Sequence, residues 1–313
     1  MSDVRVVRTL TGDDARWAHD LVDAATAADG VAPLSEQGRL AVDGAGDSAE
    51  GVVRHVLSPY GYAVVVVSPG DGTAMIEAVV DPGHRRHGYG RALVEEAFAQ
   101  ARELGVQASI WAHGDLPGAA ALAASLGLTR NRELLQLRRP AGHGASGATG
   151  NADGSDLPEQ VVDPSIELRT YAGPGDDAEI LRVNNAAFDW HPEQGGWSLA
   201  QIHERTGSDW FDPQGLFLAY DRKSSRLLGF HWTKMQSPEL AEVYIVGVDP
   251  AAQGRGLGRL LTLAGLYYFV RVGASEVMLY VEGDNTAALN TYEKLGFTRY
   301  AVDVAYGATE PRD

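Results

Sequence analysis

The chain has 313 residues, of which 44% are apolar and 22% charged, as expected of a globular protein long enough for two domains. Its formal net charge of −16 disfavours nucleic acids and anionic membranes as partners, because both are negatively charged. The absence of cysteine excludes disulfides, zinc–thiolate sites and a cysteine nucleophile. No apolar run approaches the roughly 20 residues of a membrane span, and no signal core opens the chain, so we expect a cytoplasmic protein.

The hydrophobic pattern predicts strands and helices in both halves of the chain. In the first half it predicts strands at 75–80 and 108–111 and helices at 90–104 and 119–126. In the second half it predicts strands at 166–171, 215–220, 227–234, 242–248, 276–281 and 297–306, and helices at 176–188, 199–206, 258–272 and 285–295. Antiparallel-looking strands followed by a β-α-β-α-β order indicate a mixed α/β sheet with helices on its faces.

A stretch of small and polar residues separates the two halves. Residues 140–156 contain no large apolar side chain and are rich in glycine, which is typical of a flexible linker. We therefore predict one domain at 1–139, a linker at 140–163 and a second domain at 164–313.

The two halves repeat one another. Three pairs of segments match in order: 80–82 with 248–250, 88–91 with 256–259, and 126–130 with 295–299. The offset is 168 positions for the first two pairs (248 − 80) and 169 for the third (295 − 126). Chance matches would not keep both order and spacing, so the pattern indicates a duplicated domain.

The most informative segment follows the second Val-Asp-Pro strand end. Glycines at 254, 256 and 258 allow a tight turn whose N–H groups converge at a helix start, an arrangement that binds phosphate. No lysine completes a mononucleotide loop, and Leu261 occupies the position of the third glycine in the dinucleotide fingerprint. The turn is therefore predicted to bind a phosphate group of another kind of ligand.

The pattern Gln-x-x-Gly-x-Gly at 253–258, with Arg-x-x-Gly-x-Gly at 85–90, resembles the pyrophosphate loop of the GCN5-related N-acetyltransferase (GNAT) superfamily. A second signature of that superfamily, Asn-x-x-Ala followed by Tyr-x-x-x-Gly-Phe, lies at 285–297. Asn285 and Tyr292 are seven residues apart, so they share one face of the predicted helix. The resemblance implies two tandem GNAT domains that use acetyl-coenzyme A as co-substrate.

The same resemblance implies coenzyme contacts in both halves. In the first half these are Ala78, Val79, Val80, Arg85, Arg86, His87, Gly88, Tyr89, Gly90 and Arg91. In the second half they are Val246, Gly247, Val248, Gln253, Gly254, Arg255, Gly256, Leu257, Gly258, Arg259, Asn285, Thr286, Ala287, Ala288, Leu289 and Asn290. The first half departs from the pattern because it has His87 where the second has Arg255.

Acetyl transfer to an amine requires a base that accepts the amine proton and an acid that protonates the departing thiolate. Superfamily members place the base on the strand before the loop and the acid on the later helix, which implies Glu242 and Tyr292 here. At the repeat offsets these fall on Ala74 and Ala123, so the first half is expected to be non-catalytic. Glu77 would weaken that expectation if the register slipped.

A narrower resemblance is to the mycothiol synthase family. It rests on residues 176–188, 191–197, 210–213, 229–234, 242–244, 279–282 and 300–306, and in the first half on 30–33 and Glu36. Members acetylate the cysteinyl amine of cysteinyl-glucosaminyl-inositol, and the resemblance implies substrate contacts at Glu36, Glu179, Lys234, Glu242 and Tyr280. Carboxylates suit a cysteinyl ammonium, and the other side chains suit hydroxyl groups.

Other functions stay open at this stage. A tandem acetyltransferase would also suit another small amine or a protein amino terminus, and assays on the cysteinyl pseudodisaccharide against such amines would separate these acceptors. A non-catalytic acetyl-coenzyme A sensor would bind without turnover, and a first half that binds a partner protein is a third possibility. His84 and His87 lie beside arginines and no HExxH motif occurs, so we predict no metal site. We expect a monomer.

Overall fold

The structure is a computed structural model that describes residues 4–44, 51–67, 72–142, 157–189 and 194–308. The chain forms two compact units. The first unit consists of residues 1–134 with 301–313, and the second unit consists of residues 135–300. No helix in the described ranges has both the length and the apolar character needed to span a membrane.

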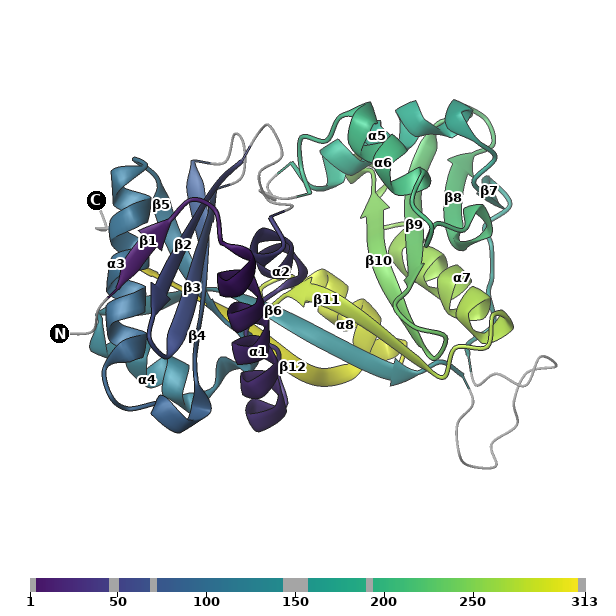
Figure 1. The fold of residues 1–313 in the computed structure, drawn as a ribbon. Helices are drawn as coiled ribbons and strands as arrows, with labels where there is room; N and C mark the ends of the chain where they lie inside the picture. The colour runs from purple at the N-terminus through teal and green to yellow at the C-terminus, as the bar shows by residue number, and fades with distance from the viewer. Residues whose placement is uncertain (1–3, 45–50, 68–71, 143–156, 190–193, 309–313) are drawn as a thin grey trace. The chain divides into compact units, whose positions relative to one another are not determined.

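The first unit is a mixed sheet with helices on both faces (Figure 1). Its strands are β1 (Arg5–Val7), β2 (Val52–Ser58), β3 (Gly61–Val67), β4 (Thr73–Val80), β5 (Gln107–Ala112), the start of β6 (Leu128–Pro140) and the end of β12 (Thr298–Ala308). Its helices are α1 (Gly12–Asp29), α2 (Glu36–Val42), α3 (Tyr89–Glu103) and α4 (Pro117–Ser125). Strands β1 to β4 pair antiparallel in sequence, whereas β4 and β5 are parallel.

Strand β3 lies at the centre of this unit's core. Val64 belongs to a buried cluster with Leu21 of α1, and Val65 belongs to a cluster with Leu93 of α3. Helices α1 and α3 therefore cover opposite faces of the sheet. A strand covered on both faces has apolar residues in an unbroken run, as β3 does from Ala63 to Val67.

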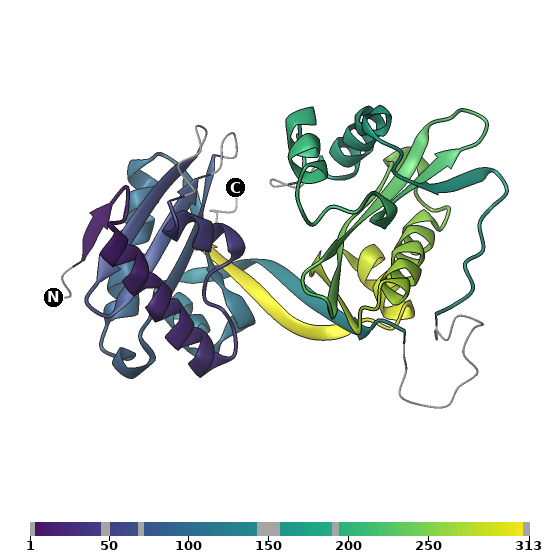
Figure 2. The ribbon, with the colours of Figure 1, turned by 45° about the vertical axis from the view of Figure 1, so that its right-hand side comes forward.

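The second unit has the same architecture (Figure 2). Its strands are β7 (Ile166–Thr170), β8 (Leu216–Asp221), β9 (Leu227–Met235), β10 (Leu240–Val248), β11 (Glu276–Glu282) and the end of β6, and its helices are α5 (Asp177–Ala187), α6 (Leu199–Thr206), α7 (Leu257–Arg271) and α8 (Thr286–Lys294). Ile180 of α5 and Ile202 of α6 pack with Trp232 on one face. Leu261 of α7 packs with Ala219 on the other face.

Most elements of the second half follow the sequence prediction. Each predicted helix or strand ends within two residues of its observed counterpart, and Ser198 caps α6 as part of a capping box. The sequence analysis assigned no element before residue 75 and did not predict β6. Two helices (α1 and α2) and four strands (β1, β2, β3 and β6) were thus missed.

Each unit contains a strand from the other half of the sequence. The end of β12, predicted within the second domain, runs antiparallel to β5 with Val304 opposite Ala112. The last residues of β6, which follows α4, belong to the second unit beside β11. The chain therefore passes between units at Leu135 and returns at Ala301, so the compact units differ from the predicted domains at 1–139 and 164–313. Pairing with a distant strand satisfies the edge hydrogen bonds of β5 and β11, and no local sequence pattern reports it.

The predicted linker at 140–163 lies largely outside the described residues. Its described ends belong to the second unit. Ala141 and Leu157 are buried, and the Ala141 amide donates to the Ser275 carbonyl at 2.9 Å.

Candidate active site

The two parallel strands of the second unit separate part-way along their length. Strands β10 and β11 pair from Leu240 to Glu242, which lies opposite Met278, and the pairing ends there. Strand β10 continues to pair with β9 as far as Val248, opposite Gly229. Beyond Glu242, one edge of β10 therefore has no neighbouring strand within the described sheet, and its backbone groups are open to a ligand.

The backbone direction identifies which amides face that open edge. The Asp249 amide donates to the Leu228 carbonyl of β9 at 2.8 Å. Because backbone groups alternate along a strand, the N–H groups of Val246 and Val248 point to the open edge and that of Gly247 points to β9. A Cβ at Gly247 would lie 2.6 Å from the ring of Phe230, so only glycine fits there.

A β-bulge lies where the strands separate. The β9–β10 register shifts by one residue between Val243 and Ile245, whereas the β3–β4 ladder of the first unit shows no shift. Counted from the first parallel pair of each unit, Glu242 corresponds to Met75, not to the predicted Ala74. The extra residue of the bulge is the reason for the difference, and both first-unit positions are apolar.

Glu242 is a buried carboxylate that lies opposite a lysine. Its side chain is 7% exposed, and the Gln236 amide donates to its carboxylate. Lys234 is directly opposite Glu242 in the β9–β10 ladder. The Lys234 ammonium lies 5.0 Å from the ring centroid of Trp210 and 5.5 Å from that of Tyr244, which are cation–π distances.

These two aromatic residues were not assigned a role by the sequence analysis. Trp210 lies in one of the segments that carried the family resemblance, and Tyr244 lies in another. Trp210 lies in the loop after α6, whereas Lys234 is on β9 and Tyr244 is on β10. Because these three elements meet only in the folded chain, no spacing in the sequence would have identified the contact.

Tyr292 lies near the end of α8. Its ring contacts that of Phe297 edge to face, with 5.7 Å between centroids. Burial raises the pKa of Tyr292 to about 12, so the phenol stays protonated at neutral pH. Among the described residues its hydroxyl has no hydrogen-bond partner, which leaves it available to a ligand.

The glycine-rich turn opens α7. Gly254 and Gly256 have φ angles of +77° and +74°, which side chains rarely adopt, and Gly256 is the residue that caps the helix. Arg255 and Arg259 are exposed on this turn. A helix N-terminus that follows a glycine-rich turn and carries two exposed cations is suited to bind an anion.

The predicted coenzyme helix α8 is also capped. The Asn285 side chain accepts a hydrogen bond from the Ala288 amide at 3.1 Å. Asn285 therefore fixes the start of the helix, and residues 286–290 form its first turns.

Glu179 does not lie beside Glu242. Its carboxylate binds Arg182 at 2.8 and 2.9 Å and accepts the Leu227 amide at 3.0 Å. Leu227 is seven residues from Lys234 along β9, or roughly 23 Å at ~3.3 Å per residue. Arg182 also binds Asp249 at 2.6 Å and lowers the pKa of Glu179. These contacts place Glu179 at the end of the unit that carries the coenzyme turn.

The two remaining predicted substrate residues have different surroundings. Tyr280 lies on β11 beyond the separation point, is 43% exposed, and accepts a hydrogen bond from the Gln136 amide at 2.7 Å. Glu36 is the first residue of α2 in the first unit and is exposed.

The loop of the first unit is built differently. Arg85 binds the Asp29 carboxylate at 2.8 and 2.7 Å. Arg86 occupies the position of Gly254 with a φ of +68°, a conformation unfavourable for arginine. Arg91 binds Glu95 and the Ser125 hydroxyl at 3.2 and 2.9 Å, whereas its counterpart Arg259 has no partner among the described residues.

A buried polar cluster lies beside the separation point of β4 and β5. Glu77 is fully buried, and its carboxylate accepts the Ser35 amide at 3.0 Å and binds His113 at 2.7 Å. His113 also lies 3.1 Å from Asp303 of β12. Burial by itself would lower the pKa of His113, but its bonds to Asp303 and Glu77 outweigh burial and raise it to about 9.

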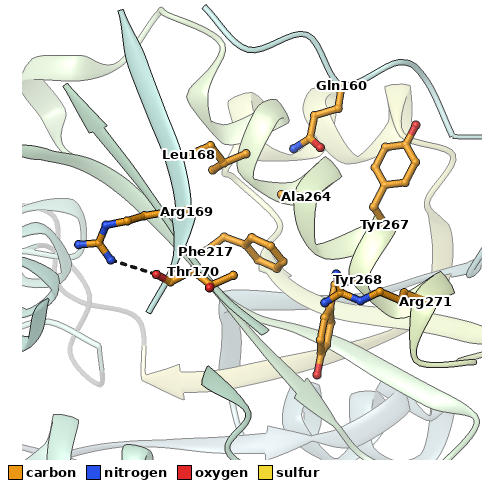
Figure 3. Close-up of a pocket in the computed structure, with 9 residues that line it drawn as sticks. All are labelled: Gln160, Leu168, Arg169, Thr170, Phe217, Ala264, Tyr267, Tyr268 and Arg271. Atoms are coloured by element: carbon orange, nitrogen blue, oxygen red, sulfur yellow. Dashed lines mark hydrogen bonds between the residues drawn. The ribbon is translucent and has the colours of Figure 1, made fainter. Parts of the chain in front are cut away.

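The second unit also contains a cavity of about 230 Å³ (Figure 3). It is lined by Gln160, Leu168, Arg169, Thr170, Phe217, Ala264, Tyr267, Tyr268 and Arg271. None of the predicted site residues lines it. Over the described ranges, no group of three or more acidic or histidine side chains is arranged to hold a metal ion.

Comparisons with known proteins agree with this geometry. The model of the acetyltransferase (GNAT) family matches residues 46–128 and 183–297. A mycothiol acetyltransferase of Gordonia bronchialis is 63% identical, covering 98% of this chain and 96% of that protein, and one of Nocardia farcinica is 54% identical, covering 97% of both. A GCN5-related N-acetyltransferase from Sphaerobacter thermophilus has a similar crystal structure, with a TM-score of 0.72, 20% identity and coverage of 99% and 97%. The predicted tandem GNAT fold is confirmed.

Proposed function

Since the chain belongs to the acetyltransferase (GNAT) family, and to the mycothiol acetyltransferases within it, we propose that it acetylates the cysteinyl amine of cysteinyl-glucosaminyl-inositol. Acetyl-coenzyme A is the acetyl donor of this family. The observation that carries the proposal is the open edge of β10, which has Glu242 at one end and the glycine-rich turn at the other.

The second unit binds acetyl-coenzyme A along this edge. The pyrophosphate lies on the turn at Gly254–Gly258, where amides, the α7 dipole and Arg259 meet its charge. The pantetheine arm takes the place of the missing strand and bonds to the amides of Val246 and Val248. This arrangement brings the thioester toward the separation point of β10 and β11.

Glu242 and Tyr292 perform the proton transfers. An α-amine has a pKa near 8, so the carboxylate of Glu242 accepts its proton, directly or through a water molecule. The amine nitrogen attacks the thioester carbon, the C–N bond forms and the C–S bond breaks. Tyr292 donates its proton to the departing thiolate. The products are an amide and free coenzyme A.

The acceptor lies against Lys234 and Tyr280, whose polar groups suit the hydroxyls of glucosamine and inositol. Glu36 and Glu179 remain predicted contacts of the acceptor, although Glu179 is already bound to Arg182. The proposal also includes a catalytic second unit, a first unit that binds coenzyme without turnover, and a monomer located in the cytoplasm.

The test is an acetyl-transfer assay of the full chain on a panel of acceptors. The panel contains cysteinyl-glucosaminyl-inositol, free cysteine, glucosaminyl-inositol and a peptide with a free amino terminus. We expect kcat/KM to be highest for the complete cysteinyl pseudodisaccharide. Equal values for cysteine or the peptide would overturn the proposed acceptor, and coenzyme binding without turnover on any acceptor would instead support a sensor.

Two variants test the proton transfers separately. Tyr292→Phe and Glu242→Gln should each lower kcat about 10²-fold, the typical contribution of a general acid or base. Tyr280→Phe serves as a matched control that should raise the KM for the acceptor and leave the KM for acetyl-coenzyme A unchanged. An unchanged kcat in Tyr292→Phe would remove the acid role from this residue.

A further inference from the structure

The end of α8, which carries Tyr292, is held by a specific backbone arrangement. The Phe297 amide donates to the Tyr292 carbonyl at 3.0 Å, and the Gly296 amide donates to the Glu293 carbonyl at 2.9 Å. Gly296 has a φ of +84°. These features form a Schellman motif, in which the contact between the Phe297 and Tyr292 rings is the usual accompanying apolar contact.

The motif leaves the carbonyl of Leu295, the last residue of the turn, without a partner in its own helix. The guanidinium of Arg139 supplies that partner, because its Nη1 donates to the Leu295 carbonyl. Its Nε donates to the Pro140 carbonyl at 2.8 Å, so the planar group is fixed at two points. Arg139 is only 7% exposed.

Arg139 acts on this helix end in two further ways. Its charge lies at the C-terminus of α8, where the helix dipole favours a cation. Its guanidinium carbon also lies 6.0 Å from the Phe297 ring centroid, and Phe297 is the residue that contacts Tyr292. A chain of direct contacts therefore runs from Arg139 through Leu295 and Phe297 to the phenol ring.

We infer that Arg139 is a positioning residue for proton donation by Tyr292, an inference that rests on the proposed function. Arg139 comes from β6, the strand that follows the first half of the sequence, although it lies in the second unit. At the repeat offset of 169, Arg139 falls on Ala308 and Tyr292 on Ala123. Arg139 and Tyr292 thus come from different copies of the repeat but lie in the same unit, and the first unit has alanine at both corresponding positions.

The test is a double-mutant cycle on the full chain. Arg139→Gln should lower kcat about tenfold, because a small displacement of a reacting group has effects of this order, and should change neither KM by more than about twofold. Arg139→Lys, which keeps the charge and one donor, should recover part of the loss. In the Tyr292→Phe background, neither substitution at Arg139 should lower kcat further, since the group it positions is absent.

Arg138→Gln is the matched control. Arg138 lies next to Arg139 on β6, binds Glu276 at 2.7 Å, donates from Nε to the Gln136 side chain at 3.1 Å and lies over the Tyr300 ring. The variant loses these contacts without touching the end of α8, and only its kcat is compared, because Gln136 in turn donates to Tyr280. Its kcat should stay unchanged. The thermal midpoint of unfolding of each variant, with and without acetyl-coenzyme A, shows whether that variant is folded at the assay temperature.

The inference is overturned if Arg139→Gln and Arg139→Lys keep the normal kcat, or if their losses multiply with that of Tyr292→Phe. It is also overturned if Arg138→Gln loses as much kcat as Arg139→Gln. An unchanged kcat in Tyr292→Phe alone is a different result, because it rejects the acid role in the proposed function.

Discussion

The two units share a scaffold but differ where their parallel strands separate. In the second unit a bulge interrupts β10, and Glu242 lies opposite Lys234. In the first unit β4 has no bulge, and the carboxylate that follows the last parallel pair, Glu77, is bound to His113 beneath α2. A Cβ at Gly38 of α2 would lie 2.0 Å from that carboxylate, so the helix is in close contact with it.

Under the proposed function, the backbone features that bind the coenzyme are separable from the side chains that transfer protons. Both units keep diverging strands followed by a turn and a helix, which are backbone features that many sequences satisfy. Proton transfer depends on a few side chains. The extra residue of the bulge in β10 and the helix α2 that covers Glu77 change which groups those side chains can contact.

The largest expected effect concerns the buried cluster of the first unit. Glu77→Ala should lower the free energy of unfolding by about 3 kcal/mol, because it removes the buried acceptor of the Ser35 amide and one of the two carboxylates that bind His113. Urea denaturation measures this change. At a temperature where the variant is folded, kcat should be unchanged, and a large loss of kcat would show that the first unit takes part in catalysis.

The pH dependence of stability should have opposite signs in the two units. The pKa of His113 is raised to about 9. Its contribution to the free energy of unfolding is therefore fully present below pH 6.5 and is lost as pH rises through 9. Burial lowers the pKa of His231 to about 4. Its neutral form therefore contributes fully to the free energy of unfolding above pH 6.5, and this contribution is lost as pH falls toward 4. Each contribution is about 3 kcal/mol at most.

Urea denaturation between pH 4 and pH 9 tests both limbs. His113→Gln should remove the alkaline loss and leave the acid loss, while His231→Gln should do the reverse. If one substitution removed both losses, the two histidines would not act on separate units.

The coenzyme turns should differ in their effect on turnover. Gly256→Ala and Gly88→Ala each place a side chain at a φ of +74° and +89°, which costs about 1–2 kcal/mol. Gly256→Ala should raise the KM for acetyl-coenzyme A about tenfold, the equivalent of ~1.4 kcal/mol. Gly88→Ala should leave steady-state kinetics unchanged. Equal effects of the two variants would contradict a single catalytic unit.

The smallest effect is expected at the second position of each turn, which is Arg86 in the first unit and Gly254 in the second. Arg86→Gly should stabilise the first unit by about 0.5–1 kcal/mol, because glycine adopts a φ of +68° without strain. Gly254→Ala should destabilise the second unit by a similar amount, since the surrounding space is open and only the backbone conformation is unfavourable. Thermal midpoints of unfolding of both variants measure the two changes in stability. A loss of stability in Arg86→Gly would show that the contacts of the arginine side chain stabilise the unit by more than its backbone strain destabilises it.

Local sequence patterns were sufficient to predict the repeat, the elements of the second half and the two glycine-rich turns. These features are local, because periodicity, caps and positive φ angles depend on residues a few positions apart. Gly254 and Gly256 could therefore be identified from their spacing, and the structure places both in the left-handed region.

The contacts between distant side chains became visible only in the folded structure. The pairing of β12 with β5, the contact of His113 with Asp303 and the bond from Arg139 to Leu295 join residues that are 156 or more positions apart. The bulge in β10 changed the counterpart of Glu242, and the ion pair with Arg182 holds Glu179 near the first residue of β9. Strand partners and ion pairs are chosen by the free energy of the whole folded chain, so no short segment of sequence encodes them.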